Sequence, residues 1–483
     1  MSTILIAPWG QPAQWGNATY ITPSGLRIKT CTSLLPTLVE LIKNKHRNIK
    51  VVIPVLDSLI EEYRGRPRGS ICYEKFLELY GSIIKSNYLS YRHLIDDIER
   101  LVRLAAREII EESLEMNKNV ISGEEQKRIL DIIKFNLHVI VCPAIGSPGG
   151  KWRFEGDARD YLAVALIRCY ELLKESPPDK IILDLSHGIN FMPALTLQLA
   201  YMIASVSLLS SKDTRLVRIE AFNTDPFPHD AKEPDLNINL VHRDLVSSIT
   251  LPPEIPKHII SPRVYISSDV RKKVDELNRI YINAVNGPIS SLYYPFPLAL
   301  SLYCYDNMVD LRNARLIREV FRLWITNVEV KEFVINRPLR LNPEAVYLYL
   351  LASTACNTTL SIVKLYDSHR ASIRSLKELQ SIYEKVNNSL GQIVGWELDK
   401  FEDEAAKVSQ YLDKGKCIHE LSQRGVIGTR IMIAHAGLQK DIVEICKEED
   451  GEMTIRYAYT EPITNGKNLT ELLKRAGLLL LKQ

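Results

Sequence analysis

The chain lacks any pair of cysteines spaced for a zinc knuckle or a CxxC redox motif. Its eight cysteines are scattered over 483 residues, most of them inside apolar runs. Cysteines in that setting are typical of small buried side chains, and a large chain with scattered cysteines fits a reducing compartment. We therefore expect no metal site and no required cofactor, and we place the protein in the cytoplasm.

Long hydrophobic runs and an excess of charge of one sign are also missing. The longest apolar run, residues 194–209, contains Gln198 and several serines and is short for a membrane span. The start, MSTILIAPWG, has no basic leader, so we expect no signal peptide and no membrane partner. The net charge of +3 neither requires nor excludes nucleic acid, because a binding patch can be local.

No internal repeat is visible, yet the length requires two or three domains. In residues 1–245, short apolar strands alternate with helical patterns, which predicts an α/β domain with a parallel, doubly wound sheet. A helical insertion is expected at about 72–135. The expected strands are 3–10, 49–56, 137–144, 180–185, 216–222 and 236–241.

The composition changes near residue 245. Residues 246–335 begin with a proline-rich stretch, LPPEIPKHIISP, and are predicted to be a linker region that also allows a helix-turn-helix. Residues 336–483 are predicted to be an all-α domain, with a small hairpin around Asp450-Gly451 and a last helix at 468–482. A preceding helix from Ser268 is expected to end at Gly287-Pro288.

The stretch LDLSHGINFMP holds polar residues and a glycine between a strand and a helix. Ser186, His187, Gly188 and Asn190 occupy this turn. A nucleophile elbow would need a glycine where Asp184 stands, which disfavours a hydrolase. Two interpretations remain open on the residues alone: a helix cap, or a phosphate or nucleotide site at the start of the helix.

The first strand ends in a comparable turn, APWGQPAQWGNATY, which contains Trp9, Gly10 and Trp15. Turns at the carboxyl ends of parallel strands meet at one sheet edge, so we expect the two turns to lie together. An indole beside phosphate donors suits an aromatic base, although it suits a core equally well. A third, glycine-rich turn at 146–157 could close over an anion.

Near the C-terminus, Arg430 precedes His435 by five residues, in the stretch GTRIMIAHAGL. Histidine can accept and donate a proton near neutral pH, and arginine can hold a charged phosphate, which together suit metal-free RNA cleavage. On a helix, five residues rotate by about 140°. One copy of the pair therefore makes no tight dyad, whereas two copies at a two-fold axis would. The alternative is a helix with an exposed arginine and a half-buried histidine.

Together, APWG near the start, DLSHGINFMP in the middle and the R-x4-H pair near the end resemble the CARF–HEPN ribonucleases of type III CRISPR systems. The resemblance implies an N-terminal Rossmann-like CARF domain that binds cyclic oligoadenylate, expected to be cyclic tetra-adenylate. It also implies a C-terminal HEPN domain that degrades single-stranded RNA without metal, as a homodimer or a higher oligomer of dimers. The ligand site then maps to Trp9, Gly10, Trp15, Ser186, His187, Gly188 and Asn190, and the catalytic pair to Arg430 and His435.

One residue departs from the family pattern: Ile431 stands where a polar residue often follows the arginine. A competing hypothesis is a CARF-type transcription regulator that binds DNA through residues 246–335, but it leaves R-x4-H unexplained. A further activity would be compatible with the first hypothesis, namely slow cleavage of the bound ligand at the Ser186 turn.

Overall fold

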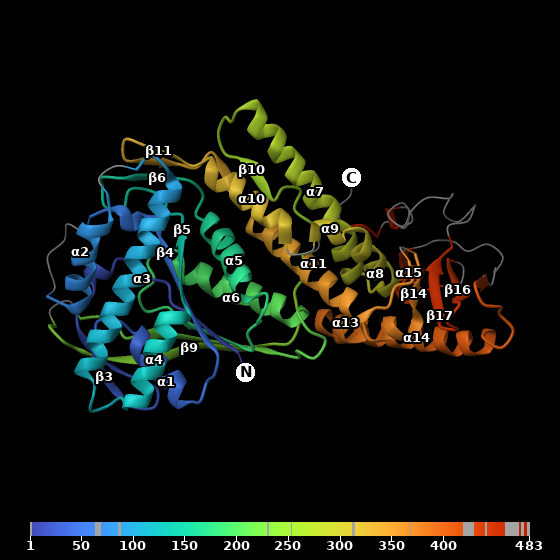
Figure 1. Cartoon of the computed structure of the whole chain (residues 1–483), viewed down its shortest axis with the longest axis horizontal. Coiled ribbons are helices and arrows are strands. Elements are labelled where there is room, and N and C mark those ends of the chain that lie inside the picture. Colours follow the sequence, from blue (N-terminus) through green and yellow to red (C-terminus); the bar gives the residue numbers. More distant parts are fainter. Residues whose placement is uncertain are drawn as a thin grey trace.

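The computed structural model describes residues 2–483 except for 63–68, 86–87, 229–230, 253, 312–313, 368, 419–428, 440–441, 459–472, 475–477 and 481–483. The molecule is elongated (Figure 1). The large sheet of the N-terminal half lies at one end of the long axis, and a small sheet of the C-terminal half lies at the other. A bundle of helices fills the space between them.

The N-terminal half is built on one eight-stranded sheet with the order β3-β2-β9-β8-β7-β1-β4-β5. The strands are β1 (Thr3–Ile6), β2 (Ala18–Ile21), β3 (Arg27–Thr30), β4 (Ile49–Leu56), β5 (Leu137–Cys142), β7 (Lys180–Asp184), β8 (Val217–Thr224) and β9 (Asp235–Val246). The five strands from β8 to β5 are parallel, which confirms the predicted sheet. Strand β9 is antiparallel to β8, and the edge strands β2 and β3 were not predicted.

Helices cover the central strands because these strands are apolar on both faces; every residue of β1 is buried. The helices of this half are α1 (Leu34–Lys43), α2 (Ile71–Ile83), α3 (Tyr91–Met116), α4 (Gly123–Phe135), α5 (Asp160–Leu173) and α6 (Met192–Leu209). Helices α3 and α4 contact β5, and α5 and α6 pack on the strands from the other side (Figure 1). Helices α2 to α4 occupy the predicted insertion.

The remainder of the chain is mainly helical, as predicted. Its helices are α7 (Ser268–Tyr293), α8 (Pro297–Asp306), α9 (Met308–Leu311), α10 (Arg315–Thr326), α11 (Pro343–Ile362), α12 (Ile373–Lys377), α13 (Gln380–Val386), α14 (Asn388–Val408) and α15 (Thr429–Ala434). Helix α7 continues through Pro288, so the predicted end at Gly287-Pro288 is wrong. The helix runs on to Tyr293, and Gly287 packs closely against the ring of Tyr303. The predicted helix at 468–482 falls largely outside the described residues.

Short strands accompany these helices. They are β6 (Arg153–Glu155), β10 (Ile260–Pro262), β11 (Glu329–Lys331), β12 (Val334–Asn336), β13 (Leu339–Leu341), β14 (Ala371–Ser372), β15 (Lys416–Ile418), β16 (Val443–Lys447) and β17 (Met453–Tyr457). The last four form a sheet with the order β14-β17-β16-β15, in which β16 and β17 are the predicted hairpin. The other short strands form a two-stranded sheet, β10-β13, and a three-stranded sheet, β11-β12-β6. In the described residues, the C-terminal half is thus helical with small sheets added.

A buried ion pair joins the two halves. Arg337 and Asp57 are both fully buried and paired with each other, and Arg337 also donates to the carbonyl of Ala144 at 2.9 Å. Asp57 follows β4, so this contact lies at the carboxyl edge of the large sheet. Helix α11 packs on α5 and α6, and one hydrophobic core runs through both halves.

The interpretation of most cysteines as small buried side chains did not foresee that six of the eight are joined in disulfides. Disulfides join Cys31 to Cys72, Cys304 to Cys356 and Cys417 to Cys446, whereas Cys142 and Cys169 are free and buried. Sequence spacing missed these bonds because the partners are 29 to 52 residues apart. Disulfides occur in oxidising compartments and also inside cells of hyperthermophiles, so they do not by themselves name a compartment.

Two helices, α6 and α11, are long and apolar enough to cross a membrane by length and composition alone. Most of each lies buried inside the fold, 61% of the apolar window of α6 and 78% of that of α11. Both helices therefore have the character of core helices.

Candidate ligand turn and nuclease site

The turns after β1 and β7 lie together, because the two strands are neighbours in the parallel sheet. The amide of Gly10 donates to the carbonyl of His187 at 2.8 Å. A Cβ on Gly10 would lie 2.7 Å from Ile189 and 3.2 Å from that carbonyl, so only glycine fits here without displacement. We call this pair of turns, residues 7–15 and 184–190, the ligand turn.

His187 is held as a neutral imidazole in the ligand turn. Its Nε2 accepts a hydrogen bond from the amide of Ser33 at 3.1 Å, and its ring lies 4.0 Å from the ring of Trp15. Burial lowers the pKa of His187 to about 3. The amide contact acts in the same direction, because a protonated Nε2 could not accept it. His187 is thus a fixed, uncharged part of the site.

The two tryptophans of the ligand turn occupy different environments. Trp9 is 1% exposed and packs edge-on against Trp15, with ring centroids 5.1 Å apart. Trp15 is half-buried. In this conformation Trp15 is therefore the indole that a base could reach, and Trp9 packs against it from inside the fold. The indole N–H of Trp9 has no acceptor among the described residues.

The polar groups of the 184–190 segment divide between the interior and the surface. Asp184 is buried, accepts from the Ser33 hydroxyl at 2.7 Å and from the Ser186 amide at 3.3 Å, and has its pKa raised by burial. Gly188 packs against Pro8 and Pro193. Asn190 is exposed and has a positive φ of 51°, which asparagine tolerates better than most residues.

Three backbone amides of the third turn, at 146–157, are already occupied by a carboxylate. The Glu61 carboxylate already accepts from the amides of Gly149, Lys151 and Trp152, at 2.6, 3.0 and 2.6 Å. Its strand β6 pairs with β12. This turn therefore attaches the sheet edge to the segment after α10, and the hypothesis that it closes over a ligand is not supported.

Arg430 and His435 lie on a short helical segment in the C-terminal half. Helix α15 ends at Ala434, and His435 follows in a turn where Ala436 and Gly437 have positive φ. The helix was expected to continue through AHAGL, but a Cβ on Gly437 would lie 2.9 Å from the ring of Phe296. Both Arg430 and His435 are exposed, and so is Ile431 between them.

A glutamate that the sequence interpretation missed contacts the histidine. Glu397, on α14, is 7% exposed, and its Oε2 lies 3.2 Å from Nδ1 of His435. This contact orients the ring and leaves Nε2, on the opposite side, for other partners. The available signal was its position: Glu397 interrupts the apolar stripe of Val394, Leu398 and Phe401 on its helix.

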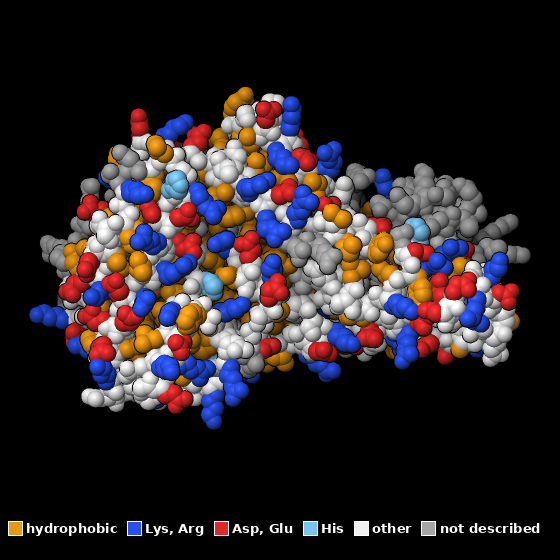
Figure 2. All heavy atoms as spheres, in the orientation of Figure 1, with side chains coloured by type: hydrophobic (Ala, Val, Ile, Leu, Met, Phe, Trp, Pro, Cys, Tyr) orange, Lys and Arg blue, Asp and Glu red, His pale blue; other side chains and the backbone are white. Residues whose placement is uncertain are grey.

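Charges around these sites are mixed. Figure 2 shows acidic and basic side chains interspersed over the visible face. Among the described residues, one group could hold a metal ion, namely Cys417, Glu444 and Cys446, and its two cysteines are joined in a disulfide.

Comparison with known proteins matches both halves in the same order. Residues 4–226 match the family model for the CARF domain of the CRISPR system endoribonuclease Csx1, and residues 372–461 match the model for its HEPN domain. The chain is also 25% identical over 491 residues to the CRISPR system endoribonuclease Csx1 of Methanocaldococcus jannaschii. That alignment covers 92% of this chain and 87% of the relative. The ligand turn lies inside the first match, and Arg430, His435 and Glu397 lie inside the second.

Proposed function

Since the chain belongs to the CARF–HEPN endoribonucleases associated with type III CRISPR systems, we propose that it is a ligand-gated ribonuclease. Its substrate is single-stranded RNA, and its activator is a cyclic oligoadenylate bound at the ligand turn. The observation that carries the proposal is the contact between Glu397 and His435, because it supplies an oriented imidazole close in the chain to the exposed Arg430.

The reaction that this pair suits is transfer of the RNA phosphate to its own ribose. The 2′-hydroxyl loses its proton and attacks the adjacent phosphorus, the P–O5′ bond breaks, and the departing 5′-oxygen takes up a proton. His435 takes or returns a proton, and the Arg430 guanidinium holds the charge that develops on the phosphate oxygens. Glu397 keeps the imidazole oriented. One product carries a 2′,3′-cyclic phosphate end and the other a 5′-hydroxyl end, and no step requires a metal ion.

The working site is composite, built from two copies of the chain. Among the described residues, one chain offers a single histidine beside Glu397 and Arg430, whereas the reaction uses both a base and an acid. A two-fold axis doubles both groups around one phosphate. The same axis would pair two ligand turns, and cyclic tetra-adenylate has a matching two-fold symmetry. The protein is thus proposed to be a homodimer, or an assembly of such dimers, acting on RNA in the cytoplasm.

Three features of the ligand turn support its role as the sensor. The half-buried Trp15 offers a face for an adenine, the Trp9 indole N–H lacks an acceptor, and α6 begins directly after the turn. A helix N-terminus favours a phosphate through its free amides and its dipole. The domain divisions 1–245, 246–335 and 336–483 remain predictions.

The test is RNA cleavage by the purified protein with and without cyclic tetra-adenylate, in buffer containing EDTA. We expect weak basal cleavage and an increase of about a hundredfold, which corresponds to about 2.7 kcal/mol of coupling between the sites. Equal rates with and without the ligand would reject gating. Loss of cleavage on chelation, restored by magnesium, would reject the metal-free mechanism.

A forced heterodimer tests the composite site. One parent chain is paired with one His435→Ala chain, and cleavage is measured per dimer. If both histidines serve one phosphate, the heterodimer is nearly inactive. Half the parental rate or more would show that each chain cuts alone.

A further inference from the structure

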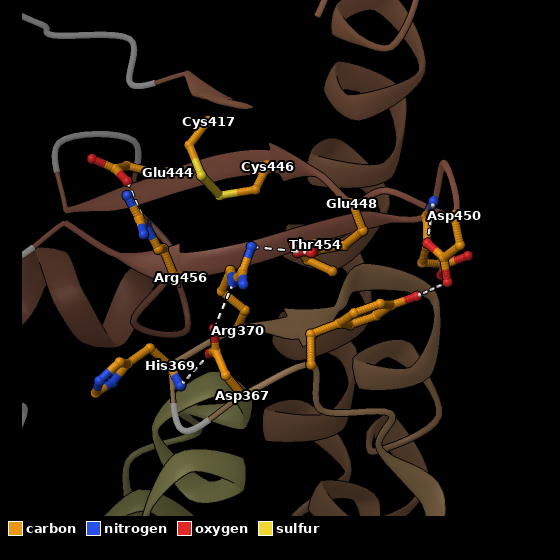
Figure 3. Close-up of polar contacts among 12 residues, drawn as sticks. Asp367, His369, Arg370, Cys417, Glu444, Cys446, Glu448, Asp450, Thr454 and Arg456 are labelled. Carbon is orange, nitrogen blue, oxygen red and sulfur yellow. Dashed lines mark hydrogen bonds and ion pairs between the residues drawn. A yellow bond between two sulfur atoms is a disulfide. The ribbon is translucent and has the colours of Figure 1, made fainter. Parts of the chain in front are cut away.

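The Cys417–Cys446 disulfide closes the stretch of chain that carries the nuclease pair. Cys417 lies on β15, and Cys446 lies directly opposite it on β16. The bond therefore cross-links two neighbouring strands (Figure 3). Arg430 and His435 both lie between the two cysteines in the sequence. The bond therefore joins the two ends of the segment on which cleavage is proposed to depend.

This disulfide also differs from the other two in its accessibility. Cys417 is half-buried, whereas the cysteines of the Cys31–Cys72 and Cys304–Cys356 bonds are at most 2% exposed. Thiol–disulfide exchange requires the attacking thiolate to reach a sulfur. A dithiol reductant should therefore open the Cys417–Cys446 bond while the other two remain closed.

The two strands joined by the bond are held very differently. Strand β16 pairs with β17 on its other side, and Arg456 of β17 donates to Glu444 at 2.6 Å (Figure 3). Directly after β16, Glu448 accepts from Arg370 at 3.0 Å. Strand β15 is three residues long, lies at the sheet edge and pairs only with β16. Opening the bond should release β15 and leave the rest of the sheet in place.

The nuclease pair lies in residues 429–438, which we call the nuclease segment. Met432 and Ala436 are fully buried, and Leu438 is 1% exposed, so this end of the segment is attached to the core. Arg430 is exposed and lies between these buried residues and Cys417 in the sequence. The disulfide at Cys417 is therefore an attachment of the chain on the N-terminal side of Arg430.

We propose that Cys417 and Cys446 form a reversible redox site that controls the nuclease segment. A thiolate of a dithiol reductant attacks Sγ of Cys417 and forms a mixed disulfide, and Cys446 leaves as a thiolate. The second thiol of the reductant then closes its own disulfide and frees Cys417. Two electrons and two protons pass to the protein, which becomes the slower, reduced form. The effect on rate rests on the proposed function, whereas the redox site itself does not.

The first experiment follows the thiols and does not involve RNA. The folded protein is titrated with dithiothreitol, free thiols are alkylated, and the labelled positions are found by mass spectrometry. We expect Cys417 and Cys446 to be labelled at reductant levels that leave Cys31, Cys72, Cys304 and Cys356 unlabelled. Simultaneous labelling of all three pairs, or earlier labelling of another pair, would overturn the proposal.

The second experiment compares hydrogen exchange in oxidised and selectively reduced protein. Exchange should rise in peptides covering 429–438 and stay unchanged in those covering β1 and β4. In the disulfide form the two Sγ atoms and a Glu444 carboxylate oxygen lie within 4.8 Å of one another, so buffers must be stripped of transition metals that could bind the freed thiols. Unchanged exchange at 429–438 would overturn the proposed control even if the protein proved to have no nuclease activity.

The third experiment measures activated RNA cleavage in the parent and in Cys417→Ser. Reduction should slow the parent on the order of tenfold, because small displacements of a positioning group have effects of that size or larger. Cys417→Ser should be as slow as the reduced parent and should not respond to reductant. If the rate of Cys417→Ser still changes with reductant, another disulfide causes the change and the proposal is rejected. Equal rates for the oxidised and the reduced parent would also reject the proposal. Activity that survives Arg430→Ala and His435→Ala would instead reject the proposed function.

Discussion

The ligand turn and the nuclease segment are built in opposite ways. The ligand turn lies on adjacent strands of a large sheet, and its members are held by backbone contacts such as Gly10 to His187 at 2.8 Å. The nuclease segment begins with the six-residue helix α15 and presents Arg430 and His435 to solvent. Among the described residues, the contact with Glu397 is the polar side-chain contact of the histidine. For the proposed gating, the ligand must bind the active state better than the inactive state, and we expect the weakly held nuclease segment to differ between the two.

The largest expected effect is loss of the nuclease pair. Arg430→Ala and His435→Ala should each lower activated RNA cleavage by at least roughly a hundredfold, because each removes a group that acts on the phosphate. Since both side chains are exposed, the melting temperature and the binding of cyclic tetra-adenylate should not change. Cleavage assays, thermal melts and ligand titration check the three points. A fall in melting temperature that accounts for the lost activity would assign His435 to the core instead.

The next effect tests the close packing of the ligand turn. Gly10→Ala places a Cβ 2.7 Å from Ile189 and should force the two turns apart. We expect weaker ligand binding and an activation factor roughly tenfold lower, because gating depends on binding the active state better. The matched control is Gly81→Ala on α2, where a Cβ meets nothing within 4 Å. If both variants respond to the ligand like the parent, the turn is not the sensor.

A third effect concerns orientation at the nuclease segment. Glu397→Gln should lower kcat on the order of tenfold and leave KM for RNA unchanged, because Glu397 acts through His435 and does not meet substrate. The control is Glu402→Gln on the same helix, whose partner is the exposed Lys377. A merely structural Glu397 would instead lower the melting temperature at unchanged kcat.

Prediction from sequence succeeded where a pattern is local and repeated. Strands such as 49–56 and 137–144 are continuous apolar runs, and the structure has them as β4 and β5. The sequence also indicated correctly that the turns of Trp9 and Ser186 would share an edge, since parallel strands require it. The roles of the predicted site residues remain predictions.

The features that the sequence did not predict depend on distant partners. The contact between Glu397 and His435 spans 38 residues, and the Cys417–Cys446 bond spans 29. Pro288 signals a helix end, yet α7 continues to Tyr293, with Gly287 packed on Tyr303. Likewise, the glycine-rich turn at 146–157 has the composition of an anion site, but Glu61 already accepts from three of its amides. In each of these cases the structure depends on contacts with residues that a local sequence pattern does not include.

The smallest effect is a pH dependence that separates the two regions. Burial lowers the pKa of His187 from 6.5 to about 3. Between these two pH values, His187 therefore binds a proton in the unfolded chain but not in the folded chain. Stability is therefore fully present above pH 6.5 and falls as the pH drops from there toward 3, by up to about 1.4 kcal/mol per pH unit. Asp184, whose pKa is raised by burial, acts in the opposite direction.

The comparison must hence be made between the parent and His187→Gln, which can still accept from Ser33 but does not titrate. Denaturant unfolding at pH 7 and pH 5 should show a smaller loss of stability in His187→Gln than in the parent. Equal losses in the two proteins would mean that His187 is not held neutral by the fold.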